Sequence, residues 1–107
     1  MGAKIQFIQM TNGQLQKHIR SISKKSDRVF ITDHARIRML QRKISDYQVL
    51  DCLRNGSIQR PSCTDKKTGD IKCRMEHFGS SRNISVVVAL TPIDPDVIII
   101  TVMYQSR

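Results

Sequence analysis

The fold of this chain is decided by residues 86–100, which read VVVALTPIDPDVIII. Two continuous apolar runs, 86–90 and 97–100, are rich in β-branched residues, which favour strands. The segment between them carries two prolines and two aspartates, residue types that are typical of turns. The short connection predicts an antiparallel pair of strands. Because neither run alternates with polar residues, we expect both strands to be central and covered on both faces.

Further strands are expected on the N-terminal side of this pair. Together the expected strands span residues 57–63, 70–78, 84–91 and 96–104. Turn-forming segments that contain Gly, Asp, Asn, Ser or Pro separate them at 65–69, 79–83 and 92–95. Three short connections in succession predict an antiparallel meander of roughly four strands.

The first half of the chain is expected to be helical, since its apolar residues recur at helical spacing up to about residue 56. The capping residues define three helices, which run from Thr11 or Asn12 to about Lys25, from Thr32 or Asp33 to about Lys43, and from Ser45 to Asn55-Gly56. Each has an apolar side, formed in turn by Leu15, Ile19 and Ile22, by Ile37, Leu40 and Ile44, and by Val49, Leu50 and Leu53. The second and third helices are expected to form an αα-hairpin.

These elements predict a single α+β domain over residues 1–107. Residues 1–10 form an N-terminal arm or short strand, residues 11–56 the helical half, and residues 57–104 the antiparallel sheet. Two to three helices should pack on one face of the sheet. The other face is then open to a substrate or partner, or covered by the N-terminal segment.

The charge of the chain points to a polyanionic partner. Eighteen Lys and Arg against nine Asp and Glu give a net charge of +9, and residues 1–60 alone carry twelve against four, a net +8. Nucleic acid is the first candidate partner. No apolar run is long enough to span a bilayer, and three cysteines without a C-x-x-C pair predict neither a disulfide framework nor a zinc site. We therefore expect a cytoplasmic protein without a bound metal.

The segment Thr32 to Arg42 carries the clearest chemical pattern. At about 100° per residue, His34, Arg38 and Arg42 fall within about 80° of one another on a helix. The positive end of the helix dipole favours a neutral His34 that can accept a proton, while two guanidinium groups can hold a phosphate. These groups suit cleavage of RNA through its 2′-hydroxyl. The pattern is equally that of a solvated cationic helix face on which His34 caps or packs.

Other candidate residues lie in the expected sheet. Arg74 can contact a phosphate, and Tyr104 can stack on a base or close the core. His77 can transfer a proton, but it shares a strand face with Cys73 and Met75, which favours a structural role. The cysteines are expected to be structural rather than nucleophilic.

The second and third helices resemble a family of small domains from bacteria, phages and plasmids known as DUF4258. The matching residues are Thr32-Asp33-His34-Ala35, Arg38, Arg42, Ile44-Ser45, Val49, Leu53 and Gly56. This family is similar to RelE/ParE-like toxins, which set helices against an antiparallel sheet. The resemblance implies a toxin-like endoribonuclease, acting on RNA or on ribosome-associated mRNA without a cofactor and paired with an antitoxin protein.

By the same resemblance, His34, Arg38 and Arg42 are the catalytic residues, and Tyr104 matches a looser tendency of RelE-like toxins to carry Tyr or His near the C-terminus. Arg36 and Arg74 join the two arginines as RNA-binding residues on their chemistry. ParE-like toxins act on gyrase rather than RNA, so a function without RNA cleavage stays open. The alternatives are a nucleic-acid- or protein-binding module, and a phage- or plasmid-encoded inhibitor of a host protein.

Overall fold

The computed structural model describes residues 10–65, 67–78 and 83–106, with the side chains of 95 and 102–106 left out. Its helices are α1 (Asn12–Ser23), the short 3-10 helix η2 (Ser26–Arg28), α2 (Asp33–Arg42) and α3 (Asp46–Asn55). Its strands are β1 (Val29–Ile31), β2 (Ser57–Ile58), β3 (Cys63–Thr64), β4 (Ile71–Phe78), β5 (Asn83–Thr91) and β6 (Asp94–Ser106). The described part is therefore an α+β domain, as the sequence predicts. The expected arm or strand at residues 1–10 lies outside the described residues except for Met10.

The strands form one mixed sheet in the order β1-β6-β5-β4-β2, with β3 also paired to β4. The expected meander is present as β4, β5 and β6, which pair antiparallel. The expected first strand, 57–63, is instead split into β2 and β3, and Pro61, which has no N–H to donate to a strand partner, lies between them. β1 was not predicted. It pairs parallel to β6, with Phe30 opposite Ile99, a contact that depends on residues far apart in the sequence.

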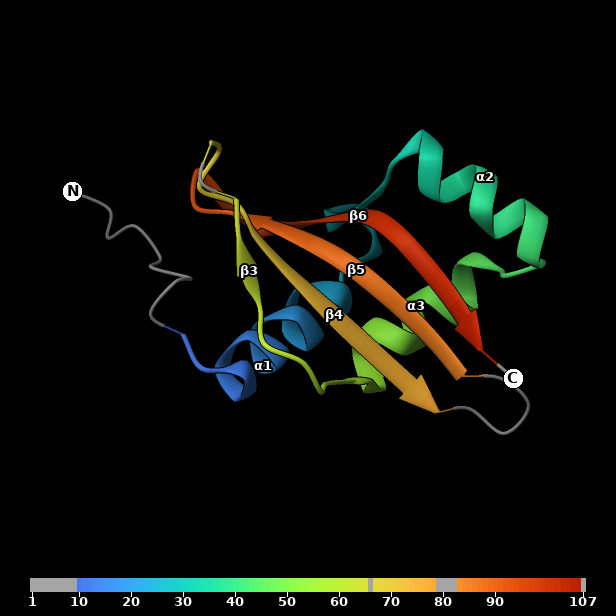
Figure 1. Ribbon diagram of the computed structural model, residues 1–107, viewed down its shortest axis with the longest axis horizontal. Coiled ribbons are helices and arrows are strands. Elements are labelled where there is room, and N and C mark those ends of the chain that lie inside the picture. The colour runs from blue at the N-terminus through green and yellow to red at the C-terminus, as the bar shows by residue number, and fades with distance from the viewer. Residues whose placement is uncertain (1–9, 66, 79–82, 107) are drawn as a thin grey trace.

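The two apolar runs occupy the middle of the sheet, since β5 and β6 each have a strand on both sides. Their expected burial on both faces is confirmed only near the end of β5, where Val88, Ala89 and Leu90 are buried in succession. Val86 and Val88 of β5 are fully buried, whereas Val87 between them is half-buried. The reason is visible in Figure 1, where α1 and α3 cover one side of the sheet and α2 stands beside the C-terminal half of β6.

The helices begin at the residues that the sequence indicates. The Thr11 and Ser45 hydroxyls accept hydrogen bonds from the N–H groups of Gln14 and Gln48, and each glutamine side chain accepts from the N–H of its capping residue. These are two capping boxes. The predicted apolar side of α1 is confirmed, with Leu15 and Ile19 fully buried. In α3 the buried residues are Val49, Cys52 and Leu53.

Helix α2 departs from the prediction. It does not form a packed hairpin with α3, because its main contacts are with β6, whereas α3 packs against α1, β4 and β5. Ala35 and Met39 are the buried side chains of α2, while Ile37 is 53% exposed and Leu40 is 81% exposed. The helix is thus rotated relative to the expected packing side, because it packs on β6 rather than against another helix.

Candidate functional site

Thr32 anchors the first turn of α2 to β6. Its backbone N–H donates to the carbonyl oxygen of Ile100 at 3.2 Å, and its hydroxyl donates to the same oxygen at 2.9 Å. The hydroxyl also accepts from the N–H of Ala35 at 3.3 Å, which is the N-cap bond that starts the helix. The residues of the first turn are therefore held in a fixed place beside the sheet.

His34, Arg38 and Arg42 follow each other at intervals of four residues along this helix, and all three are exposed. They share one side of α2, next to the side on which Ala35 and Met39 are buried. We refer to these three residues as the cationic face of α2. The buried neighbours keep the helix from rotating, so the cationic face has a defined direction toward solvent.

Arg36, the fourth predicted residue of α2, lies on a different side of the helix. Its Nη1 donates to Oδ1 of Asp46, at the start of α3, over 2.9 Å. Both side chains are more than half exposed, 52% and 60%, so the pair contributes little to stability. The ion pair turns Arg36 toward α3 and away from the cationic face.

The structure does not bring Arg74 next to the cationic face. Arg74 lies on β4, and the neighbouring Cys73 and Met75 belong to the core on the helix side, so Arg74 faces the other side of the sheet. Strand β5 separates β4 from β6, a distance of about 10 Å at the usual strand spacing. The backbone of Tyr104 in β6 pairs with that of Ser85 in β5, and the Tyr104 side chain lies outside the described part.

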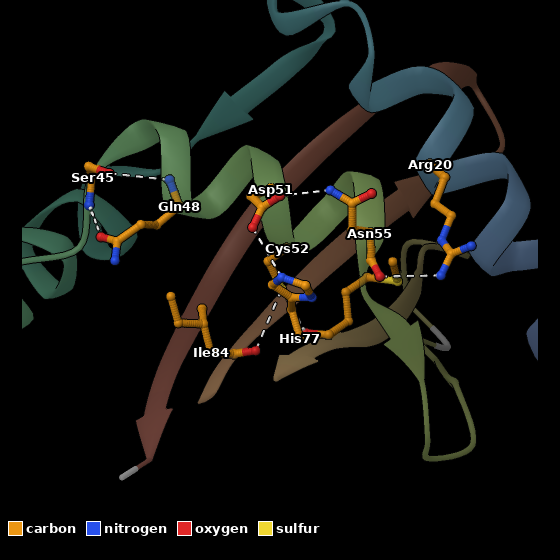
Figure 2. A network of polar contacts seen from close by, with 9 residues as sticks. Arg20, Ser45, Gln48, Asp51, Cys52, Asn55, His77 and Ile84 are labelled. Atoms are coloured by element: carbon orange, nitrogen blue, oxygen red, sulfur yellow. Dashed lines mark hydrogen bonds and ion pairs between the residues drawn. The ribbon is translucent and has the colours of Figure 1, made fainter. Parts of the chain in front are cut away.

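His77 has a partner that the sequence did not reveal. Figure 2 shows its Nε2 facing Oδ2 of Asp51 on α3, at 3.0 Å. The other oxygen of Asp51 accepts from Nδ2 of Asn55 at 2.7 Å. The imidazole of His77 is 27% exposed and the Asp51 side chain 34% exposed. A carboxylate that orients an imidazole can serve proton transfer, but here the pair also ties the end of β4 to α3.

Cys52 and Cys73 are buried, and burial keeps both thiols protonated. The Cys52 thiol donates to the carbonyl oxygens of Met75 and Ile84, at 3.3 and 3.6 Å. Burial, with the nearby Asp51 carboxylate, raises the pKa of Cys52 to about 12. Burial likewise raises the pKa of Cys73 to about 11. Because only a thiolate attacks efficiently, neither side chain is a candidate nucleophile.

Two arginines of the basic half serve the fold. The guanidinium of Arg20 in α1 donates to the carbonyl oxygen of Gly56 at 2.6 and 3.0 Å, just beyond the end of α3. In return, Nε of Arg54 in α3 donates to the carbonyl oxygen of Ser23 at 2.9 Å, at the end of α1. Cations are favourable at helix C-termini, where carbonyl groups lack partners. Arg20 and Arg54 therefore stabilise the C-terminal ends of α3 and α1, and we do not assign either charge to ligand binding.

The described residues contain no group of three His, Cys, Asp or Glu side chains arranged to hold a metal ion. Across the same residues, no helix is long and apolar enough to cross a membrane. What the structure presents is a small α+β domain with a helix-covered mixed sheet and a cationic helix along one side.

The sequence profile of a family described as a domain of unknown function, DUF4258, matches residues 31–104. The chain belongs to this family, as the resemblance predicts. The match begins at the last residue of β1 and ends within β6, and so it includes the cationic face and most of the sheet. No curated protein and no solved structure matches the chain, and the similarity to RelE/ParE-like toxins stays a prediction.

Proposed function

We propose that this protein is a toxin-like, metal-independent endoribonuclease that acts on RNA, with the cationic face of α2 as its RNA-contacting surface. One observation carries the proposal. A histidine in the first turn of an anchored helix is followed, one and two turns later, by two exposed arginines. Backbone N–H groups at such a helix start favour phosphate oxygens, so a phosphodiester bound there lies beside His34, and the long side chains of Arg38 and Arg42 lean toward it from further along the helix.

The proposed reaction uses no group other than those of the protein and the RNA. His34 takes the proton of a 2′-hydroxyl, and the freed oxygen attacks the adjacent phosphorus. Arg38 and Arg42 neutralise the charge that develops on the phosphate oxygens. The bond to the 5′-oxygen breaks, and this oxygen takes a proton from Tyr104 or from water, leaving a cyclic phosphate. Arg36 and Arg74 are assigned to more distant phosphates of the same strand. The proposed partners are RNA or the ribosome, and an antitoxin protein.

A binding module without catalysis is the second candidate. It is favoured by the exposure of His34, Arg38 and Arg42, because phosphate contacts need only accessible cations, whereas catalytic groups are more often enclosed. In this case the cationic face would hold a nucleic acid and leave it intact.

The test compares the wild-type protein with His34→Ala on total RNA and on translating ribosomes, in the presence of EDTA. Gln41→Ala, an exposed position on the same helix, controls for damage to α2. If the proposal holds, the wild type and Gln41→Ala cleave RNA, and His34→Ala does not cleave but binds RNA with nearly unchanged affinity.

A matched pair of arginine variants separates the two candidates. Arg38→Ala should weaken RNA binding and reduce the slope of log affinity against log salt by about 1, while Arg28→Ala, an exposed arginine outside α2, should change both less. If no variant cleaves and only Arg38→Ala affects binding, the protein is a binding module. If the wild type neither binds nor cleaves RNA, both candidates are wrong.

A further inference from the structure

A surface pocket lies on the other side of α2 from the cationic face. It has a volume of about 260 Å³ and is lined by Ser26, Val29, Ile31, Arg36, Asp46, Val49 and Leu50. Its less exposed part is formed by the apolar Val29, Ile31, Val49 and Leu50, while the exposed Ser26 and the Arg36–Asp46 ion pair supply the larger, polar part of its surface. A pocket of this size accommodates one large apolar side chain. Apolar side chains below exposed polar groups are common in binding sites.

Two large apolar side chains that neighbour the lining residues Arg36 and Asp46 along the helices are exposed to solvent. Leu40 is 81% exposed, and Tyr47 is 75% exposed. Leu40 follows Arg36 by one helical turn, and helical side chains lean toward the N-terminus, so Leu40 lies over the Arg36 turn. Tyr47 directly follows Asp46. Single exposed apolar residues are common on protein surfaces, but two large ones beside a pocket with apolar side chains at its base mark an interaction site.

The charges at this surface favour an acidic occupant. The guanidinium of Arg36 has five N–H donors, and Asp46 is joined to one of its nitrogens. The chain carries a net charge of +9, which attracts an acidic partner and opposes pairing with a second copy of itself. A partner carboxylate can therefore bind Arg36 beside the pocket.

We propose that this pocket, with Leu40 and Tyr47 beside it, docks an acidic amphipathic segment of another protein, one apolar side chain filling the pocket and one carboxylate binding Arg36. Leu40 is about 160° around the helix from Arg38, so a segment docked here leaves the cationic face uncovered, and Arg36 then binds the segment instead of an RNA phosphate. The inference does not rest on RNA binding or cleavage.

The experiment uses a displayed library of random 16-residue peptides, selected on the immobilised full-length protein. The enriched peptides are then synthesised and their affinities are measured by fluorescence anisotropy. We expect them to be acidic and to carry apolar residues three or four positions apart, the spacing of one helix face.

Two variants test the site itself. Leu40→Ser removes an apolar contact beside the pocket, and Ser26→Phe places a ring in the pocket from an exposed position. Each should weaken peptide binding tenfold or more. Ile93→Ser is the matched control, because Ile93 is 91% exposed and lies in the turn between β5 and β6, and it should leave the affinity unchanged. Leu40→Ser should also leave RNA binding unchanged, whether or not the protein cleaves RNA.

The proposal is overturned if no peptide is enriched, if the enriched peptides are basic or uncharged, or if their binding withstands both Leu40→Ser and Ser26→Phe. Sedimentation of the free protein tests the other occupants. A dimer that Leu40→Ser dissociates would make a second copy of the chain the occupant. Peptide affinity that rises strongly when residues 1–9 are deleted would make the chain's own N-terminal segment the occupant, and either result overturns the proposal.

Discussion

Replacing Gly56 with alanine should destabilise the fold, although it adds only one methyl group. A Cβ at this position would lie 2.3 Å from the carbonyl oxygen of Cys52 and 2.8 Å from that of Glu76. Both contacts are with backbone, which cannot turn aside as a side chain can. Gly56 has a negative φ of −77°, so the requirement for glycine comes from the close approach of α3 to β4 and not from backbone strain.

The expected loss of stability combines overpacking, weakened hydrogen bonds and a smaller opposing effect on the unfolded chain. Overpacking of this kind costs about 1–3 kcal/mol. Displacing Gly56 also weakens its N–H bond to Cys52, 2.8 Å long, and the bonds that Gly56 accepts from Arg20, each contributing about 1 kcal/mol. Alanine also restricts the unfolded chain more than glycine does, which offsets about 0.4–1 kcal/mol of the lost stability. The net loss is about 2–4 kcal/mol, which corresponds to a fall in Tm of roughly 8–30 °C for a domain near this size.

The assay is thermal and urea unfolding followed by circular dichroism, with Gly13→Ala as the control. A Cβ at Gly13 in α1 would have Thr11 Oγ1 as its nearest neighbour, at 3.8 Å, an ordinary contact. Because alanine favours helix over glycine by about 0.5–1 kcal/mol, this control should be neutral or stabilising. If Gly56→Ala loses less than about 1 kcal/mol, the close approach of α3 to β4 is not as described.

Four further predictions concern the buried thiols, helix capping and a left-handed residue. Folding keeps Cys52 and Cys73 protonated, with pKa values near 12 and 11. The free energy of unfolding should therefore stay constant below pH 9 and fall as the pH rises from 9 toward 12. Cys52→Ala should make this fall less steep, and an unchanged slope would contradict the assignment. In the native protein at pH 8 a thiol reagent should label exposed Cys63 alone, and labelling of all three cysteines at one rate would contradict their burial. Arg54→Met should cost about 1–2 kcal/mol, because it leaves the Ser23 carbonyl without this donor, whereas Arg28→Met, at an exposed position, should be near neutral by urea unfolding. Lys43→Gly should raise Tm by a few degrees, because Lys43 ends α2 with φ of 56°, a conformation that glycine adopts at lower cost; a lower Tm would show that the lysine side chain outweighs the strain.

Helix boundaries were predictable because they depend on neighbours in sequence. The capping boxes that begin at Thr11 and Ser45 each involve a glutamine three residues further on, and Thr32 caps α2 through Ala35. The two apolar runs of β5 and β6 are likewise local patterns. The family motif around His34 could be recognised for the same reason.

The packing side of α2 could not be predicted in the same way. Helical spacing predicts that Ile37, Leu40 and Ile44 form this side. In the structure Ile44 is buried just beyond the helix, but within the helix Ala35 and Met39 are buried in place of Ile37 and Leu40, because α2 packs on β6 rather than on α3. The exposed Leu40 beside a pocket, on which the docking proposal depends, follows from this packing.

The candidate site was likewise only partly predictable from the sequence. The sequence by itself determined which side chains share the cationic face of α2, since helical spacing sets the order of residues around a helix. Only the tertiary structure decided that Arg36 turns to Asp46, that Arg74 lies beyond β5, and that His77 meets Asp51 across 26 positions of the chain. Such contacts depend on how strands and helices from distant parts of the chain pack, and periodicity within one element carries no information about them.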